Sequence, residues 1–321
     1  MTSRRRIDCL VPCFNEQESI PSLLKEMASI GETIAASFEE PLSLGILIVN
    51  DGSTDDTHLV ATRELEALQG YDRRSLISLS RNFGKEAALL AGLRHSPSEA
   101  CIILDADLQD PPQLLVRMIR LWLNNYKVVN AVRKDRSEDL LIKRFTAKVF
   151  YMVFYQFSHL NIQFNSSDFR LLDRVAIDAI LSCHESIRFS KGFFAWVGFK
   201  QANVYFNRPP RKDGTTKWGG WKLWNYALDG IFSFSTAPLR IWSYLGAIVT
   251  LLSFSLGMIA MVRTLFFGIE VPGYASLFTA VTFLGGLQLV GIGVLGEYIG
   301  RTYMETKKRP QYIIEYITEV E

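Results

Sequence analysis

The stretch Asp105-Ala106-Asp107-Leu-Gln109 follows directly on the apolar run Cys101-Ile-Ile-Leu104 and is closed by Pro111-Pro112. The apolar run predicts a buried strand, and we expect the two prolines to stop it from continuing. Because side chains alternate along an extended chain, the two carboxylates and the glutamine amide should share one side. Such oxygens suit a hard cation, Mg²⁺ or Mn²⁺, that bridges nucleotide phosphates. A solvated strand-end turn would have the same composition, so the neighbouring motifs decide between the two.

Apolar runs and helix-like segments alternate along the first part of the chain. The expected strands are residues 7–13, 44–49, 76–79, 101–104 and 128–133. The expected helices are residues 19–30, a segment from about Thr57, and residues 86–93 and 175–181. This alternation predicts an α/β fold, a parallel sheet with helices on both faces, whose ligands bind outside the carboxyl ends of the strands.

Polar or charged side chains follow several of these strands, so four turns should meet at one edge of the sheet. They come from Phe14, Glu16, Asp51, Arg81, Lys85 and the acidic stretch. Asp51, which precedes a glycine, is either a turn former or an acceptor of hydrogen bonds from a nucleobase or ribose. Glu16 is either an acid in the first turn of a helix or a ribose contact.

Two uncharged stretches near the C-terminus, residues 241–262 and 271–296, are long enough to cross a bilayer. Basic residues collect before the first and after the second, whereas the short connection has none between 264 and 273. By the positive-inside rule, both ends of the chain should face the cytoplasm. Aromatic and basic residues mix over 140–157 and 218–234, which predicts two amphipathic helices lying on the membrane surface.

Composition excludes other classes of protein. The 35 Lys and Arg residues nearly balance the 33 Asp and Glu residues, which gives no support to a general nucleic-acid binder. The 4 cysteines form no CxxC pair and have no histidine at zinc spacing, so we expect reduced, buried thiols. The apolar segment after Arg4-Arg-Arg6 is too short and broken for a signal peptide.

Six ordered motifs together resemble the polyprenyl-phosphate glycosyltransferases of glycosyltransferase family 2, with the closest likeness to bacterial bactoprenol glucosyltransferases, relatives of the dolichol-phosphate mannosyltransferases. The motifs are Val11-Pro-Cys-Phe-Asn-Glu16, Asn50-Asp-Gly-Ser-Thr-Asp55, Arg81-Asn-Phe-Gly-Lys85, Asp105-Ala-Asp-Leu-Gln-Asp-Pro-Pro112, Asp168-Phe-Arg170 and Lys217-Trp218. The resemblance covers residues 7–310 and includes Leu295-Gly-Glu-Tyr-Ile-Gly-Arg301.

The resemblance implies a GT-A (Rossmann-like) domain over residues 1–230, a two-helix membrane region over 231–303 with spans at about 241–263 and 274–297, and a cytoplasmic tail over 304–321. It also implies inverting transfer of a hexose, glucose from UDP-glucose, to undecaprenyl phosphate at the bacterial inner membrane, with Mg²⁺ or Mn²⁺. A homotetramer, and links to a glycolipid flippase and a periplasmic glycosyltransferase, would follow from the same likeness.

Carried onto this sequence, the family pattern implies three sets of site residues. The donor would be bound by Pro12, Phe14, Glu16, Asp51, Lys85, Asp105, Ala106, Asp107 and Gln109, of which Asp107 and Gln109 would reach the metal. The acceptor and donor phosphates would be held by Arg133, Arg144, Arg211 and Lys217. Asp168 matches the carboxylate proposed as base, and it either removes a proton or orients the acceptor. Ser167 replaces the glycine common at that place in relatives.

Three alternatives remain at this point. The same reaction could use GDP-mannose, UDP-GlcNAc or a UDP-aminoarabinose derivative, since no residue named above reads a specific hydroxyl. A processive polysaccharide synthase would carry a QxxRW-type motif, which this sequence lacks. A non-catalytic nucleotide-binding partner of a flippase would have no need of Asp105, Asp107, Gln109 and Asp168 together.

Overall fold

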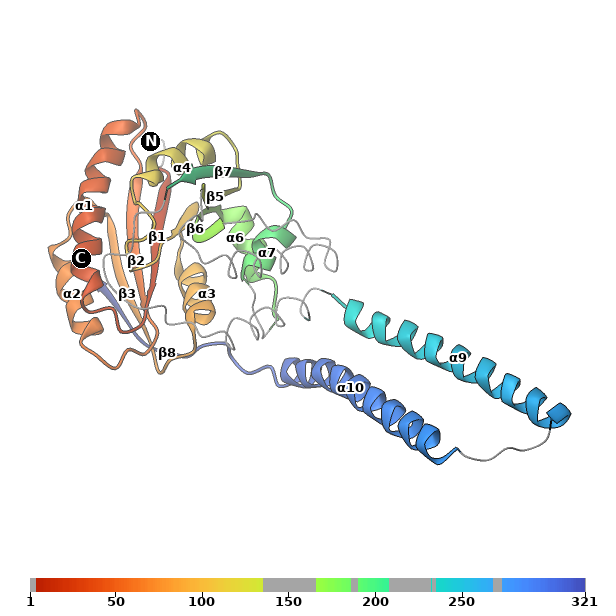
Figure 1. Cartoon of the computed structure of the whole chain (residues 1–321). Coiled ribbons are helices and arrows are strands. Elements are labelled where there is room, and N and C mark those ends of the chain that lie inside the picture. The colour runs from red at the N-terminus through yellow and green to blue at the C-terminus, as the bar shows by residue number, and fades with distance from the viewer. Residues whose placement is uncertain are drawn as a thin grey trace.

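The computed structural model describes residues 4–134, 166–185, 190–207, 232, 235–267 and 273–320. In this part of the chain an eight-stranded sheet, in the order β7-β5-β6-β4-β1-β2-β3-β8, carries helices on both faces, and a long helical hairpin extends away from it (Figure 1). The expected α/β architecture is confirmed.

The first half of the sheet follows the sequence prediction. Its strands are β1 (Arg6–Cys13), β2 (Ser43–Asn50), β3 (Arg73–Leu79), β4 (Ala100–Ile103) and β5 (Val128–Arg133). Its helices are α1 (Ser19–Ser37), α2 (Thr57–Ala67), α3 (Lys85–His95) and α4 (Leu114–Leu123). β1 pairs in parallel with both β2 and β4, and β2 with β3. These strands are buried on both faces, which explains their uninterrupted apolar runs.

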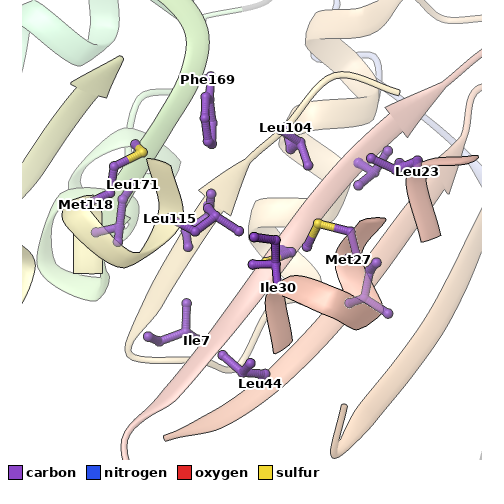
Figure 2. Packing of buried hydrophobic residues seen from close by; sticks show 14 of the residues in the cluster. Ile7, Leu23, Met27, Ile30, Leu44, Leu104, Leu115, Met118, Phe169 and Leu171 are labelled. Atoms are coloured by element: carbon purple, nitrogen blue, oxygen red, sulfur yellow. The ribbon is translucent and has the colours of Figure 1, made fainter. Parts of the chain in front are cut away.

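Two apolar clusters fill the space on either side of the sheet. The larger one packs α1, α2 and α4 against the strands, and Figure 2 shows Leu23, Met27 and Ile30 of α1 among the buried side chains of the strands and α4. The other packs α3 against the opposite face, together with α6 (Arg174–Leu181) and α7 (Ser190–Trp196). Phe169 is among the largest side chains with no exposure, and it ties the second half of the sheet to the first cluster.

The second half of the sheet is mixed, so the expectation of a parallel sheet is wrong there. β6 (Ser166–Asp173) runs antiparallel to both β4 and β5, while β7 (Gln201–Phe206) pairs in parallel with β5. Asp168 lies inside β6 and not at the start of a helix. The residue that caps α6 is Asp173, whose side chain accepts a hydrogen bond from the Val175 amide. Because β6 begins with polar residues, a search for apolar runs does not predict it as a strand.

The hairpin consists of α9 (Ala237–Phe267) and α10 (Tyr274–Thr306). Both helices are long and apolar enough to cross a membrane, and the most apolar windows within them are 0% and 6% buried. Helices that leave so much apolar surface uncovered indicate association with a membrane. The two helices meet closely at Gly291, where an added Cβ would lie 1.8 Å from Nε1 of Trp242.

The segment expected as a tail contributes the last strand. β8 (Ile314–Val320) pairs antiparallel with β3, from Leu79 opposite Ile314 to Arg74 opposite Val320. It covers the edge of β3 and connects the end of α10 directly to the sheet (Figure 1). Since β8 is an edge strand with mostly exposed side chains, its sequence has the mixed polarity of a tail.

Truncating the chain after Gln311 should therefore destabilise the catalytic domain. The deletion removes Tyr312 and Ile314, which pack against the second apolar cluster, and uncovers the edge of β3. We expect the thermal unfolding midpoint in detergent to fall by about 5 °C or more. Glu319→Gln, which removes only an exposed ion pair with Arg73, should leave the midpoint within about 2 °C. An unchanged midpoint after truncation would show that β8 is dispensable.

Candidate active site

The order of the strands reverses at β1. The chain passes from β1 to β2 and β3 on one side, and then crosses to β4 on the other side. The β1–β2 ladder continues to Cys13 opposite Asn50, but the β1–β4 ladder stops at Leu10 opposite Ile103. The two strands therefore part before β1 ends. In open α/β sheets such a switch point is where ligands bind.

The loops after β1 and β2 are locked together at this edge. Asn15, whose φ of 54° is left-handed, donates its amide to Oγ of Ser53 at 2.9 Å and accepts the Thr54 amide at 2.9 Å. The Glu16 amide donates to Oγ1 of Thr57 at 2.9 Å. Two loops that are far apart in the sequence thus form one rigid rim.

The predicted donor residues of β1 reach this rim in different ways. Pro12 is buried within β1, Phe14 is 38% exposed, and Glu16 is half-buried. The Glu16 carboxylate accepts the hydroxyl of Ser19 at 2.7 Å. Of these side chains, Phe14 is the one available for stacking against a ligand ring.

Asp51 ties the rim to the next loop. The carboxylate is 3% exposed and accepts the amides of Phe83 at 2.7 Å and Gly84 at 2.8 Å. Burial raises the pKa of Asp51, although these two hydrogen bonds act in the opposite direction. Its contact in the structure is with backbone, and the predicted contact with a nucleobase or ribose stays a prediction.

Lys85 joins two carboxylates that are far apart in the sequence. Its Nζ lies 2.7 Å from Oδ1 of Asp105, which follows β4, and 2.7 Å from Oδ2 of Asp168 on β6. Burial lowers the pKa of Lys85, but attraction to Asp168 and Asp105 outweighs burial and raises it above its ordinary value. Burial raises the pKa of Asp105; Lys85 opposes this, and the nearby carboxylates of Asp168 and Asp107 add to it.

Arg170 supports Asp168 from behind, a role that the sequence analysis missed. Its guanidinium, 2% exposed, donates to the carbonyl oxygens of Ser167 at 3.0 Å and Asp168 at 3.4 Å. The same group lies 3.9 Å from the ring centroid of Phe194 on α7. The signal was present in the sequence as Asp168-Phe-Arg170, because alternation directs Phe169 and Arg170 to opposite faces of a strand.

The acidic stretch is a turn, so the expectation that its oxygens alternate along an extended chain is wrong. β4 ends at Ile103, Leu108 has a left-handed φ of 53°, and Oδ1 of Asp107 accepts the Gln109 amide at 3.1 Å. Asp107 is exposed, Ala106 is buried, and Gln109 is 7% exposed. The prolines do not end the strand; carbonyls of Pro111 and Pro112 accept the first amide hydrogen bonds of α4.

The oxygen-bearing side chains at this turn fit a divalent cation whose remaining ligands would come from a bound substrate and water. Among the described residues, no group of three or more His, Cys, Asp or Glu could hold a metal. Asp107 offers an exposed carboxylate, and the buried Oε1 of Gln109 has no hydrogen-bond partner in the described part of the chain. Because that oxygen is covered, it could reach a cation only after a shift of the turn. Mg²⁺ commonly binds through one or two carboxylates, with water and phosphate oxygens completing its shell.

The predicted phosphate-binding residues are placed in part. Arg133 ends β5, and its Nη2 lies 4.0 Å from Oδ1 of the buried Asp110. Arg144, Arg211 and Lys217 lie outside the described residues, as does the expected surface helix over 140–157 and almost all of the one over 218–234. The structure therefore brings Lys85, Asp105 and Asp168 together, and the binding of a donor at this edge stays a prediction.

Two family models match this chain. The model of glycosyl transferase family 2 matches residues 8–181, and that of the GtrB C-terminal hairpin matches residues 237–302. The first covers every described element of the site, and the second covers the apolar hairpin.

Similar proteins match over nearly their whole length. A prophage bactoprenol glucosyl transferase homolog of Escherichia coli (strain K12) is 45% identical, covering 97% of this chain and 99% of that protein. The bactoprenol glucosyl transferase of Shigella phage SfX is 44% identical with coverages of 97% and 99%. An uncharacterized glycosyltransferase of Synechocystis sp. is 44% identical with coverages of 96% and 94%.

Substituting Gly52 tests whether the loop after β2 must approach the β3–α3 loop as closely as it does in the structure. A Cβ on Gly52, at φ +63°, would lie 2.3 Å from the carbonyl carbon of Arg81. Gly70 has φ +82° but nothing within 4 Å of its added Cβ, so it is a matched control for backbone strain alone. We expect Gly70→Ala to cost about 1 kcal/mol and Gly52→Ala about 1–3 kcal/mol more. Thermal unfolding in detergent measures both, and equal losses would contradict the close approach.

Lys85→Met should change the pH dependence of catalysis. Removing the ammonium group leaves Asp105 with only burial and neighbouring carboxylates, which both raise its pKa. If catalysis requires ionised Asp105, the acid limb of the pH–activity profile should move to higher pH by about one unit or more. The control is Lys127→Met, which breaks an ion pair with Asp173 at 3.1 Å away from this edge. Identical acid limbs in wild type and Lys85→Met would contradict the assigned role of Lys85.

Proposed function

The chain belongs to glycosyltransferase family 2, and on this basis we propose that it transfers glucose from UDP-glucose to undecaprenyl phosphate and forms polyprenyl-phosphate-glucose. One observation carries the proposal: identity of 44–45% to a bactoprenol glucosyl transferase and to a prophage homolog of one extends over 97% of this chain and includes the hairpin. The Lys85–Asp105–Asp168 cluster supports the proposal, because it gathers charged side chains at the sheet edge where ligands bind in this kind of fold.

The proposed reaction is a single displacement with inversion. An oxygen of the lipid phosphate forms a bond to the anomeric carbon, while the bond from that carbon to UDP breaks and UDP leaves with the electron pair. Because the second pKa of a phosphate monoester is about 6, the acceptor is already ionised at neutral pH. We therefore assign Asp168 to orienting the acceptor or the sugar, held in place by Lys85 and Arg170.

A divalent cation, Mg²⁺ or Mn²⁺, would offset the negative charge that develops on the departing diphosphate. Asp107, and Gln109 after a shift of the turn, would hold that cation. Phe14, Glu16 and Asp51 would face the nucleoside from the rim on the other side of the switch point. Arg133 and the residues outside the described part, Arg144, Arg211 and Lys217, would bind phosphate because guanidinium and ammonium groups pair with its oxygens.

The hairpin would keep this site near the lipid that carries the acceptor. Both of its ends lie on the side of the sheet (Figure 1). These ends contact each other: the hydroxyl of Tyr298 donates to the carbonyl of Ser235 at 2.6 Å, and the Tyr298 ring packs edge-on against Phe232. Basic residues flank these ends, so the positive-inside rule favours a cytoplasmic catalytic domain and termini at the inner membrane. The homotetramer and the links to a flippase and a periplasmic glycosyltransferase stay predictions.

Purified full-length protein should be incubated with undecaprenyl phosphate, Mg²⁺ and one donor at a time: UDP-glucose, UDP-GlcNAc or GDP-mannose. We expect the mass of the lipid to increase by one hexose with UDP-glucose and to change far less with the other two. Asp168→Asn serves as the low-activity control. A product only with another donor would replace glucose, and binding of UDP without any glycolipid would favour the non-catalytic alternative.

A further inference from the structure

A cavity lies away from the proposed active site. It has a volume of about 560 Å³ and is formed by the last turn of α3, the segment after α6, and the connection from α10 to β8. Its lining residues are Arg94, Cys183, His184, Glu305, Lys308, Arg309, Pro310, Gln311 and Tyr312. None of them belongs to the catalytic edge. On α3, Lys85 is the first residue and Arg94 is in the last turn, so the two sites use opposite ends of that helix.

The cavity is predominantly basic. Arg94, Lys308 and Arg309 carry permanent positive charges, and Glu305 is the single acidic side chain in the lining. All three basic residues are exposed, and the guanidinium of Arg94 lies 6.0 Å from the ring centroid of Tyr312. Three cations around one opening favour a ligand with a concentrated negative charge, above all a phosphate group, which accepts bidentate hydrogen bonds from arginine.

The position of the cavity indicates where that phosphate comes from. The candidate membrane span of α10 is Ala280–Thr306, and Lys308 lies two residues beyond its end. At Lys308 the chain turns, with φ +47°, and continues toward β8. The uncharged part of α10 ends at Gly296, and the charged end of the helix, which includes Glu297, Arg301 and Glu305, leads to Lys308 and Arg309 on the side where lipid headgroups would lie. A basic pocket in this position is suited to anionic lipid headgroups.

We propose that this cavity binds the headgroup of an anionic phospholipid, such as phosphatidylglycerol, from the bilayer around the hairpin. Arg94 and Arg309 pair with the headgroup phosphate, and Lys308 adds a third positive charge. The bound lipid would join three elements of the catalytic domain, α3, the end of α6 and the start of β8, to the membrane surface. This site is separate from the one that would bind the acceptor lipid.

Native mass spectrometry of the full-length protein, released from detergent micelles, tests the proposal. The wild type is titrated with phosphatidylglycerol or phosphatidylcholine, beside Arg94→Gln/Arg309→Gln. The matched control is Arg117→Gln/Arg120→Gln, which removes two exposed arginines from α4. At roughly five-fold per basic group, we expect the cavity variant to bind phosphatidylglycerol about 25-fold more weakly, with the control unchanged and phosphatidylcholine bound weakly by all three. Arg94→Lys/Arg309→Lys, which keeps the charge but loses the bidentate hydrogen bonds, should bind more strongly than the glutamine variant and more weakly than the wild type, which separates loss of charge from misfolding.

Three outcomes would overturn the proposal. The first is equal binding of phosphatidylglycerol by the cavity variant and the control. The second is displacement of the lipid by millimolar inorganic phosphate, which would make the cavity a site for free anions. The third is displacement by undecaprenyl phosphate alone, which would make it part of the acceptor site. Glucosyl transfer is measured on the same samples, so that a failure of the proposed function is recognised separately.

Discussion

The site depends on one ammonium group that holds two carboxylates. Asp105 follows a parallel strand and Asp168 lies on an antiparallel one, and Lys85 from a third element lies 2.7 Å from each. Burial raises the pKa of Asp105, and Lys85 opposes both this effect and the rise caused by the nearby carboxylate of Asp168. Lys85 thereby holds two acidic side chains together at the point where the strand order reverses. Each side chain is about a third exposed, so the value of the cluster lies in its geometry more than in stability.

Sequence patterns predicted the first half of the sheet because its strands are buried on both faces and its turns are rich in polar residues. The same reasoning failed where an element is only half buried or begins with polar residues. β6 starts with Ser-Ser-Asp, and β8 has mostly exposed side chains. Periodicity also predicted an extended acidic stretch, but the left-handed Leu108 and the Asp107–Gln109 hydrogen bond form a turn. The Lys85 cluster could not be read from spacing, since it depends on β6 lying beside β4.

The strand β8 changes how the membrane hairpin relates to the catalytic domain. If residues 304–321 were a free tail, α10 would be linked to the domain only through α9. Because β8 pairs with β3, the end of α10 is held by the sheet, and the contacts of Tyr298 with Ser235 and Phe232 hold the start of α9 beside α10. The hairpin is therefore attached to the domain at the end of α10 as well as at the start of α9.

In the proposed function, the loops after β1, β2, β3 and β4 would form a single nucleotide site beside Asp107. The most direct test of this site measures distances in the full-length protein with Mn²⁺ and UDP bound. Leu59, which is 67% exposed on α2, and Leu121 of α4 are each replaced by cysteine and labelled with a nitroxide. Electron spin resonance gives both distances to the metal. We predict that both distances match those from the two labelled positions to the turn between Asp105 and Gln109. Distances that place it beside Arg94, or anywhere away from that turn, would contradict the account.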